Sequence, residues 1–155
     1  MKGNTKVIER LNAQLTKELT SVDQYVLQAA MFDDWGHRKL HARLAHEADD
    51  EREHARRLIE RILFLDGTPD VATREPMKVG SDVRSMLQND LAHELEVAAS
   101  LREGITACRD AKDAGSRALL EELLVDTEED HIRWLETQLH LIDTVGLERY
   151  LAEGI

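Results

Sequence analysis

The sequence predicts an all-α protein: a four-helix bundle with a long crossover between helices two and three and a short fifth C-terminal helix. Three observations predict it. Gly and Pro, which break helices, are missing from long stretches, and both prolines lie within the single segment 67–80. Aromatic residues, which favour strands, make up only 4% of the chain. Apolar residues recur at steps of three and four, which is the period of one helical face.

The first two helices are expected on either side of Gly36. The apolar face of the first is formed by Ile8, Leu11, Leu15, Leu19, Val22 and Val26. The face of the second is formed by Leu40, Leu44, Leu58, Ile62 and Leu65. Gly67, followed by Pro69, predicts the end of the second helix. A short turn at Gly36 makes the two helices antiparallel neighbours.

The segment 67–80, GTPDVATREPMKVG, is the one long connection and can cross the length of the bundle. Ser81 is the expected N-cap of the third helix, whose apolar positions are Val83, Leu87, Leu91, Leu101 and Ile105. After a turn near Gly115, the fourth helix carries Leu120, Leu124, Leu135 and Ile142. The stretch LERYLAEGI, after Gly146, predicts the fifth helix. Two hairpins joined by one crossover form a single domain, residues 1–155.

The composition excludes several classes of function. The chain has 155 residues and a net charge of −11, and binding of nucleic acid requires a basic surface, so no nucleic acid is expected as a partner. No apolar run approaches the roughly 20 residues of a membrane-spanning helix. No membrane partner is therefore expected, and a cytoplasmic location is the default expectation.

Ionisable residues interrupt the apolar face of every long helix. The motif Glu-x-x-His occurs twice, as Glu51–His54 on the second helix and Glu128–His131 on the fourth, and this spacing places both groups on one side of a helix. The interrupting residues are Glu18, Glu47, Glu51, His54, Glu94, Glu128 and His131. A buried, unpaired carboxylate costs several kcal/mol, and no Lys or Arg occupies these positions. Something other than an internal salt bridge is expected to compensate these charges.

Two divalent cations are the simplest compensation. They bring a charge of +4, and four glutamates bring −4: Glu18, Glu51, Glu94 and Glu128. His54 and His131 can bind as neutral ligands. One Glu-x-x-His is a weak signal, but two of them, with a glutamate on each other helix, form the general ligand pattern of di-iron carboxylate bundles. Mixed oxygen and nitrogen ligands favour iron or manganese over structural zinc.

The same stretches carry a family resemblance. The chain resembles bacterioferritin along nearly its whole length, in MKGNTKVIERLN, DWG at 34–36, HARRLIERILFLDGTP, LREGI, DTEEDHIRWLETQL and GLERYL. The resemblance implies a ferritin-like bundle, a shell of 24 subunits and a ferroxidase centre with two iron ions in each subunit. It implies that Glu51 and Glu128 bridge the two ions. By the same resemblance, one ion is held by Glu18 and His54, and the other by Glu94 and His131.

Three further positions match the family. Tyr25 matches a tyrosine beside the site, which implies an electron or hydrogen-bond donor; a structural tyrosine with a satisfied hydroxyl is the alternative. His46 and Asp50 match an iron site on the inner surface of the shell, and a solvated helix face is the alternative. Asp126 could join His46 and Asp50, but it is left out of the expected site because the match to the family shifts by one residue there.

One position departs from the family pattern. Haem-binding members hold haem between two subunits through a Met directly after the first Glu of the helix-two motif, where this chain has Arg52. A guanidinium stays protonated and cannot ligate iron. The chain therefore resembles the subunit type that lacks the haem-ligating Met, and Met–Met haem is not expected in a homo-oligomer. Co-assembly with a haem-binding subunit stays open.

The predicted function is iron storage and detoxification. The chain would act as a ferroxidase that oxidises Fe(II) to Fe(III) with O2 or H2O2 and mineralises the product inside an oligomeric shell. Two alternatives stay open: a soluble di-iron oxidase or peroxidase of low oligomeric state, and a shell subunit that stores metal without catalysis. Native mass separates the first, since 24 chains of 17.7 kDa make a very large particle. The rate of Fe(II) oxidation separates the second.

Overall fold

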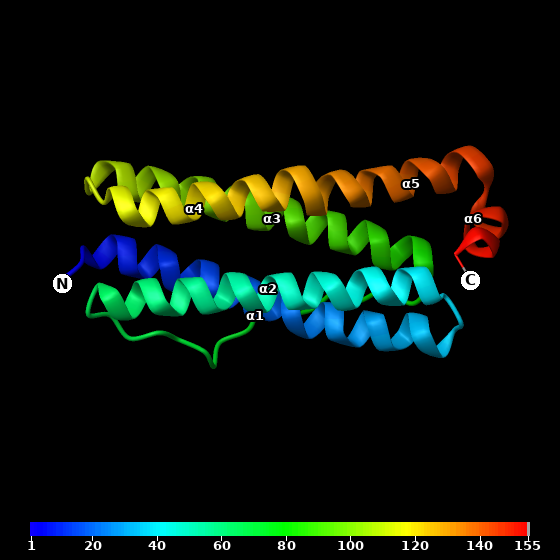
Figure 1. Ribbon diagram of the computed structural model, residues 1–155, viewed down its shortest axis with the longest axis horizontal. Helices are drawn as coiled ribbons and strands as arrows, with labels where there is room; N and C mark the ends of the chain where they lie inside the picture. Colours follow the sequence, from blue (N-terminus) through cyan, green and yellow to red (C-terminus); the bar gives the residue numbers. More distant parts are fainter. Residues whose placement is uncertain (155) are drawn as a thin grey trace.

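The computed structural model describes residues 1–154 and confirms the all-α bundle (Figure 1). The helices are α1 (Thr5–Asp34), α2 (Arg38–Phe64), α3 (Val83–Asp110), α4 (Ala114–Asp126), η1 (Thr127–Ile132), α5 (Arg133–Val145) and α6 (Leu147–Glu153). The segment η1 is a π-helical turn, and α4, η1 and α5 run on from one another as the fourth long helix of the bundle. None of the helices described is long and apolar enough to cross a membrane.

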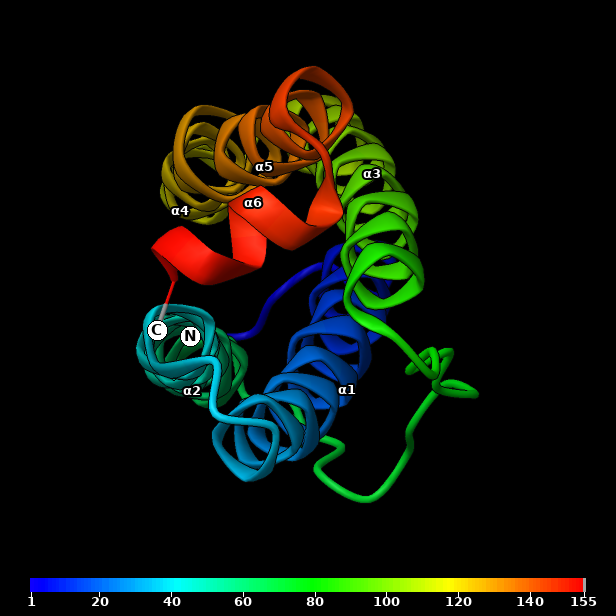
Figure 2. The same cartoon turned by 90° about the vertical axis from the view of Figure 1, so that its right-hand side faces the viewer.

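The crossover between α2 and α3 lies along the outside of α1 (Figure 2). Side chains of α1 hold it there at several points. Asn12 donates to the carbonyl of Thr68 at 3.0 Å, and Gln28 donates to the carbonyl of Val79 at 3.0 Å. The amide of Glu75 donates to the hydroxyl of Thr20 at 2.9 Å. The crossover therefore returns the chain from one end of the bundle to the other, as the position of the two prolines predicts.

Two apolar clusters form the core, one toward each end of the bundle. One includes Leu11, Leu58 and Leu101, and the other includes Phe32 and Leu87. The ionisable residues at 18, 51 and 94 lie between these clusters and are fully buried. The polar layer is thus enclosed by apolar packing on both sides.

A seven-residue step connects each cluster to the polar layer. The buried lines are Leu11–Glu18–Tyr25–Phe32 in α1, Leu44–Glu51–Leu58–Leu65 in and just after α2, and Leu87–Glu94–Leu101–Cys108 in α3. A seven-residue repeat is typical of helices that pack at small crossing angles in a left-handed bundle. In the fourth helix the line runs Leu120–Thr127–Leu135–Ile142, and its middle step is eight residues. The π-turn absorbs this extra residue.

Three local expectations were wrong. Val26 was expected on the buried face of α1, but it is 45% exposed. The buried positions of α1 run through Glu18 and Tyr25 instead. The N-cap of α3 is Asp82 rather than Ser81, since the Asp82 carboxylate accepts from the amide of Ser85 at 2.8 Å. The second helix ends at Phe64, before Gly67, and Asp66 takes the positive φ of the turn.

The fifth helix lies across one end of the bundle, between α5 and α2 (Figure 2). The amide of Lys39 on α2 donates to the carbonyl of Gly154 at 3.2 Å. Gly146, at a φ of +85°, makes the sharp turn between α5 and α6, a backbone conformation that suits a residue without a side chain. Ile155, the last residue of the expected fifth helix, lies outside the described residues.

Candidate metal centre

Three helices each contribute one fully buried glutamate to the middle of the bundle. These are Glu18 from α1, Glu51 from α2 and Glu94 from α3. Each follows a buried leucine at a distance of seven residues, so the packing of that leucine line directs the carboxylate inward. The structure therefore brings these three predicted residues together.

The two histidines of the Glu-x-x-His motifs meet the glutamates through their Nδ1 atoms. Nδ1 of His54 lies 3.8 Å from Glu18 and 3.5 Å from Glu51. Nδ1 of His131 lies 2.9 Å from Glu51 and 3.7 Å from Glu94. The two imidazole rings are nearly parallel, at 14°, with centroids 6.0 Å apart.

Glu51 belongs to two ligand groups at once. Glu18, Glu51 and His54 form one buried group whose ligand atoms all lie within 4.8 Å of one another. Glu51, Glu94 and His131 form a second such group. One oxygen of Glu51 faces each histidine. This arrangement provides two adjacent positions for cations with a carboxylate between them.

The buried acids differ in protonation. Burial, with added repulsion from Glu51, raises the pKa of Glu18 to about 7. Burial also opposes the ionisation of Glu51, but the polar groups of Glu18, His131 and His54 close to it outweigh that effect and lower the pKa of Glu51. Glu18 is therefore protonated more readily than Glu51 in the metal-free protein.

The histidines compensate the remaining charge when no metal is bound. Burial alone would lower the pKa of His54, but its hydrogen bond to Asp126 and the nearby carboxylates of Glu18 and Glu51 raise it to about 12. The pKa of His131 is likewise raised: burial opposes its charge, and hydrogen bonds to Asp50, Glu47, Glu51 and Glu94 prevail. Both rings are therefore imidazolium in the metal-free protein, and cations must displace these protons.

Many polar atoms of this layer have no hydrogen-bond partner. They include Oε2 of Glu18, Oε2 of Glu51, Nδ1 of His54 and Oε2 of Glu94. A buried polar atom without a partner costs roughly 1–3 kcal/mol, so this concentration is unusual in a native core. The donor set combines carboxylate oxygens with imidazole nitrogens, which suits iron or manganese. The residues present fit a pair of divalent metal ions.

Glu128 is the predicted ligand that the structure does not bring to this layer. Its side chain is 41% exposed and pairs with Arg102 at 3.0 Å. The expectation that it points into the bundle is wrong for this structure, and the π-turn is the reason. A π-turn pairs residues five apart, so a spacing of three no longer places Glu128 and His131 on one side. In place of Glu128, the fourth helix buries Thr127 at the height of the glutamates. The hydroxyl oxygen of Thr127 has no hydrogen-bond partner.

Tyr25 lies beside the site on α1. It is buried, and its hydroxyl donates a hydrogen bond to Glu94. Burial, with repulsion from Glu94 and Asp90, raises the pKa of the phenol well above its usual value. The hydroxyl is therefore protonated and fixes one oxygen of Glu94.

His46 and Asp50 lie nearer the surface on α2, where their side chains are 60% and 29% exposed and 3.3 Å apart. Asp50 also lies 3.5 Å from Nε2 of His131, so it connects the surface to the buried layer. His46, Asp50 and Asp130 form a group with metal-ligand spacing. Hydrogen bonding to His131 lowers the pKa of Asp50 despite its partial burial, so it is ionised.

An internal salt bridge was not expected, but Arg43 makes one at the rim of the site. It pairs with Glu47 one turn along α2 and with Asp130 of η1 at 2.9 Å. Its guanidinium also lies over the Trp134 ring, 4.7 Å from the centroid. Arg43 therefore neutralises Glu47, the outermost acid on the buried face of α2. Arg43 itself does not occupy one of the predicted positions of that face.

Two carboxylates close to the site were not among the predicted ligands. Asp126 lies 2.7 Å from Nε2 of His54, and the buried Glu47 lies 2.7 Å from Nε2 of His131. Glu47 stood on the predicted face of α2 and could have been included on that ground. Asp126 had no such signal, because its contact with His54 depends on how two helices pack.

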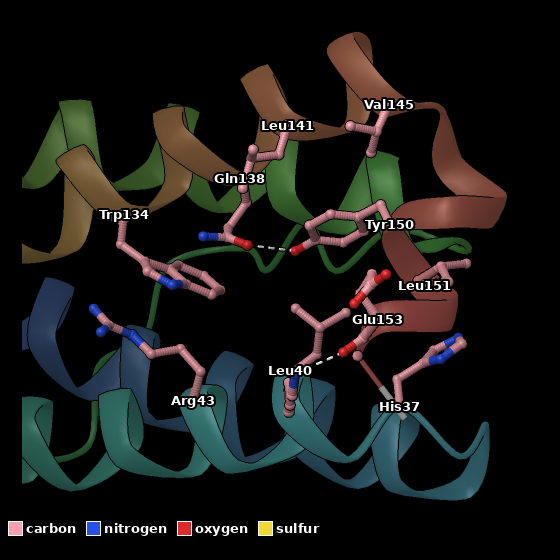
Figure 3. A pocket seen from close by; sticks show the side chains of 12 residues that line it. His37, Leu40, Arg43, Trp134, Gln138, Leu141, Val145, Tyr150, Leu151 and Glu153 are labelled. Atoms are coloured by element: carbon pink, nitrogen blue, oxygen red, sulfur yellow. Dashed lines mark hydrogen bonds between the residues drawn. The ribbon is translucent and has the colours of Figure 1, made fainter.

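A pocket of about 400 Å³ opens between α2, α5 and α6, beside the metal centre (Figure 3). Its wall is mainly apolar, with Leu40, Trp134 and Leu151. Tyr150 donates to the side-chain oxygen of Gln138 at 2.6 Å across its upper part. Trp134 also borders a much smaller cavity that touches Tyr25 and His131, so one indole separates the pocket from the site.

Arg52, where the sequence resemblance led us to expect no haem-ligating Met, is exposed. It pairs with Asp49 at 2.7 Å on the outer side of α2.

Comparison with known proteins gives a consistent result. A family model described as a ferritin-like domain matches residues 8–145. A bacterial ferritin of Synechocystis sp. is 49% identical over 151 residues, 97% of each chain. A bacterial ferritin of Pseudomonas aeruginosa is 46% identical over the whole of both chains, and a bacterioferritin of Mycobacterium tuberculosis is 42% identical over all of this chain and 97% of that one.

Proposed function

This chain belongs to the ferritin family, and from that premise we propose that it oxidises Fe(II) at the centre of its own bundle and stores the iron in a shell of like subunits. The observation that carries the proposal is the sharing of Glu51 between two buried ligand groups. Such a pair of positions lets two Fe(II) ions each give one electron to O2 or H2O2. Hard oxygen ligands favour the ferric state that results.

Each residue of the centre has a distinct part in this proposal. Glu18 and His54 hold one iron, Glu94 and His131 hold the other, and Glu51 bridges them. Binding requires the proton of Glu18 and one proton of each histidine to leave, so uptake of Fe(II) releases protons. Tyr25 donates to Glu94 and so fixes the orientation of that ligand. Glu128 reaches the site only if it leaves Arg102, so we assign it no bridging role in the resting structure.

A route for the incoming cations supports the proposal. His46, Asp50 and Asp126 lead from the exposed side of α2 to His131. Their acidic groups attract Fe(II), and the ionised Asp50 lies within reach of both the surface histidine and the buried one. We assign His46 and Asp50 to an iron position between solvent and the centre, and we place the protein in the cytoplasm.

The substitution Glu18→Gln tests the ferroxidase assignment. It keeps the shape of the side chain and removes the charge that one iron needs. We expect the initial rate of aerobic Fe(II) oxidation, followed by ferric absorbance, to fall by roughly tenfold or more, since even loss of an outer partner of a metal ligand costs 10- to 100-fold. Glu53→Gln is the control, because Glu53 is exposed and pairs with Arg56. Equal rates in both variants and the wild type would refute ferroxidase chemistry at this site.

The mass of the native particle tests the shell. We expect light scattering to give the mass of 24 chains of 17.7 kDa each, and iron loading to increase the density of that particle. A monomer or dimer that still oxidises Fe(II) would instead indicate a soluble di-iron oxidase or peroxidase.

A further inference from the structure

The two site histidines are held from behind by carboxylates on opposite helices. Each ring directs Nδ1 toward the glutamates of the centre and Nε2 away from them. Behind His54 of α2, Asp126 at the end of α4 accepts from Nε2 at 2.7 Å. Behind His131 of η1, Glu47 of α2 lies 2.7 Å from Nε2. The support is reciprocal, since each helix provides one histidine and the carboxylate behind the other.

These two carboxylates lie on the far side of each histidine ring from the glutamates of the centre. The Nδ1 atom that faces Glu18 and Glu51 lies on the opposite edge of the His54 ring from the nitrogen that contacts Asp126. The same holds for His131, where Glu51 and Glu94 face Nδ1 and Glu47 faces Nε2. Three longer contacts also reach Nε2 of His131, from Asp50 at 3.5 Å, Asp126 at 3.8 Å and Asp130 at 3.9 Å.

We propose that Asp126 and Glu47 are positioning residues that hold His54 and His131 with Nδ1 toward the metals. This inference rests on the proposed function. When a cation binds Nδ1, the imidazole is neutral and its remaining proton lies on Nε2, where the carboxylate accepts it. Such a hydrogen bond fixes the tautomer and the ring orientation and strengthens the nitrogen as a ligand.

The π-turn makes the Asp126 contact available in this chain. Asp126 and His131 are five residues apart, which is the spacing of the π-helical hydrogen bond, and both side chains reach the centre. The same turn directs Glu128 outward to Arg102. In this chain Glu128 therefore points outward, and Asp126 is the carboxylate that contacts the histidine of the opposite helix.

The two positions make a selective test possible. In Asp126→Asn, an amide replaces the charged acceptor behind His54, and in Glu47→Gln the same change is made behind His131. Cobalt(II) serves as the probe, because it needs no oxidant and its positions are identified by anomalous diffraction. Each variant is titrated with Co(II) as the assembled protein, and its crystals are soaked at a limiting concentration. Glu53→Gln is the matched control on the exposed side of α2.

We expect wild-type protein to show two Co(II) positions, one at Nδ1 of each histidine. Asp126→Asn should weaken binding roughly 10- to 100-fold at His54 and leave the position at His131 near its wild-type affinity. Glu47→Gln should do the reverse, and Asp126→Glu should recover part of the loss. Affinities within twofold of wild type in both variants would overturn the inference alone, as would an equal loss at both positions. A wild type that binds no Co(II) among these residues would overturn the proposed function as well.

Discussion

At the scale of the residue, two buried acids of the metal-free protein have surroundings that oppose ionisation, Glu18 in the ligand set and Asp90 outside it. Asp90 is the clearest case outside the ligand set. Burial raises its pKa to about 8, even though Gln24 donates to it at 2.7 Å. Together with the raised pKa of Glu18, this means that the folded protein binds protons which the unfolded chain releases at neutral pH.

These shifts predict that the metal-free protein becomes less stable as the pH rises from 5 to 8. The pKa values of Glu18, Asp90 and His54 are all raised by folding, so their contributions are complete below the unfolded pKa values and are lost as the pH rises through the folded ones. Each proton bound only by the folded state contributes about 1.4 kcal/mol per pH unit. Unfolding temperature in the presence of a chelator measures the slope.

The variant Asp90→Asn isolates one of these groups. The amide keeps the hydrogen bond with Gln24 but cannot ionise, so the loss of stability with pH should become shallower. The exposed Asp110→Asn should keep the wild-type slope. Stability that rises with pH in the metal-free wild type would show that the buried acids are ionised and otherwise compensated.

Sequence reasoning succeeds for site residues that share a line with apolar neighbours. Glu18, Glu51 and Glu94 each stand seven residues from a buried leucine, so their inward direction follows from the helical period. The contact between Asp126 and His54 joins two helices, and its formation depends on how those helices pack. No spacing within one helix predicts it.

At the scale of the element, the π-turn decides which acidic residue of DTEED faces the centre. The seven-residue repeat of the other helices is broken here by one extra residue, between Thr127 and Leu135. The sequence contains this signal, but the Glu-x-x-His motif conceals it, since Glu128 and His131 have the right spacing for an ordinary α-helix. A motif read by spacing alone therefore assigned Glu128 to the wrong side of the helix.

Deletion of Thr127 tests this account of the turn. Without that residue the fourth helix regains the seven-residue step, so the turn should become α-helical and bring Glu128 inward, one turn before His131. A crystal structure of the variant measures the change directly. Deletion of Gly115, at the turn before α4, is the control, because it leaves the π-turn sequence intact. If the variant keeps a π-turn and an outward Glu128, the extra residue is not its cause.

At the scale of the whole molecule, stability and function lie in different layers. Apolar clusters toward both ends of the bundle stabilise the fold, and the polar layer between them carries the unpartnered atoms. The sequence could predict the helices, the crossover and the hairpin order, because helix breakers other than Gly104 lie at or beside the turns and chain ends. It could not predict how α6 encloses the pocket beside Trp134, since that depends on the angle at Gly146.

The central claim is that this layer of buried acids exists to hold two divalent cations, and the most direct measurement is the number of such ions bound per chain at the centre. Anaerobic titration of the metal-free protein with Fe(II) at pH 7, with anomalous diffraction at the iron edge, should give two ions per chain, on either side of Glu51. Proton release should accompany their binding. If iron lies only on the outer surface and the centre stays free of metal at saturating Fe(II), the account is contradicted.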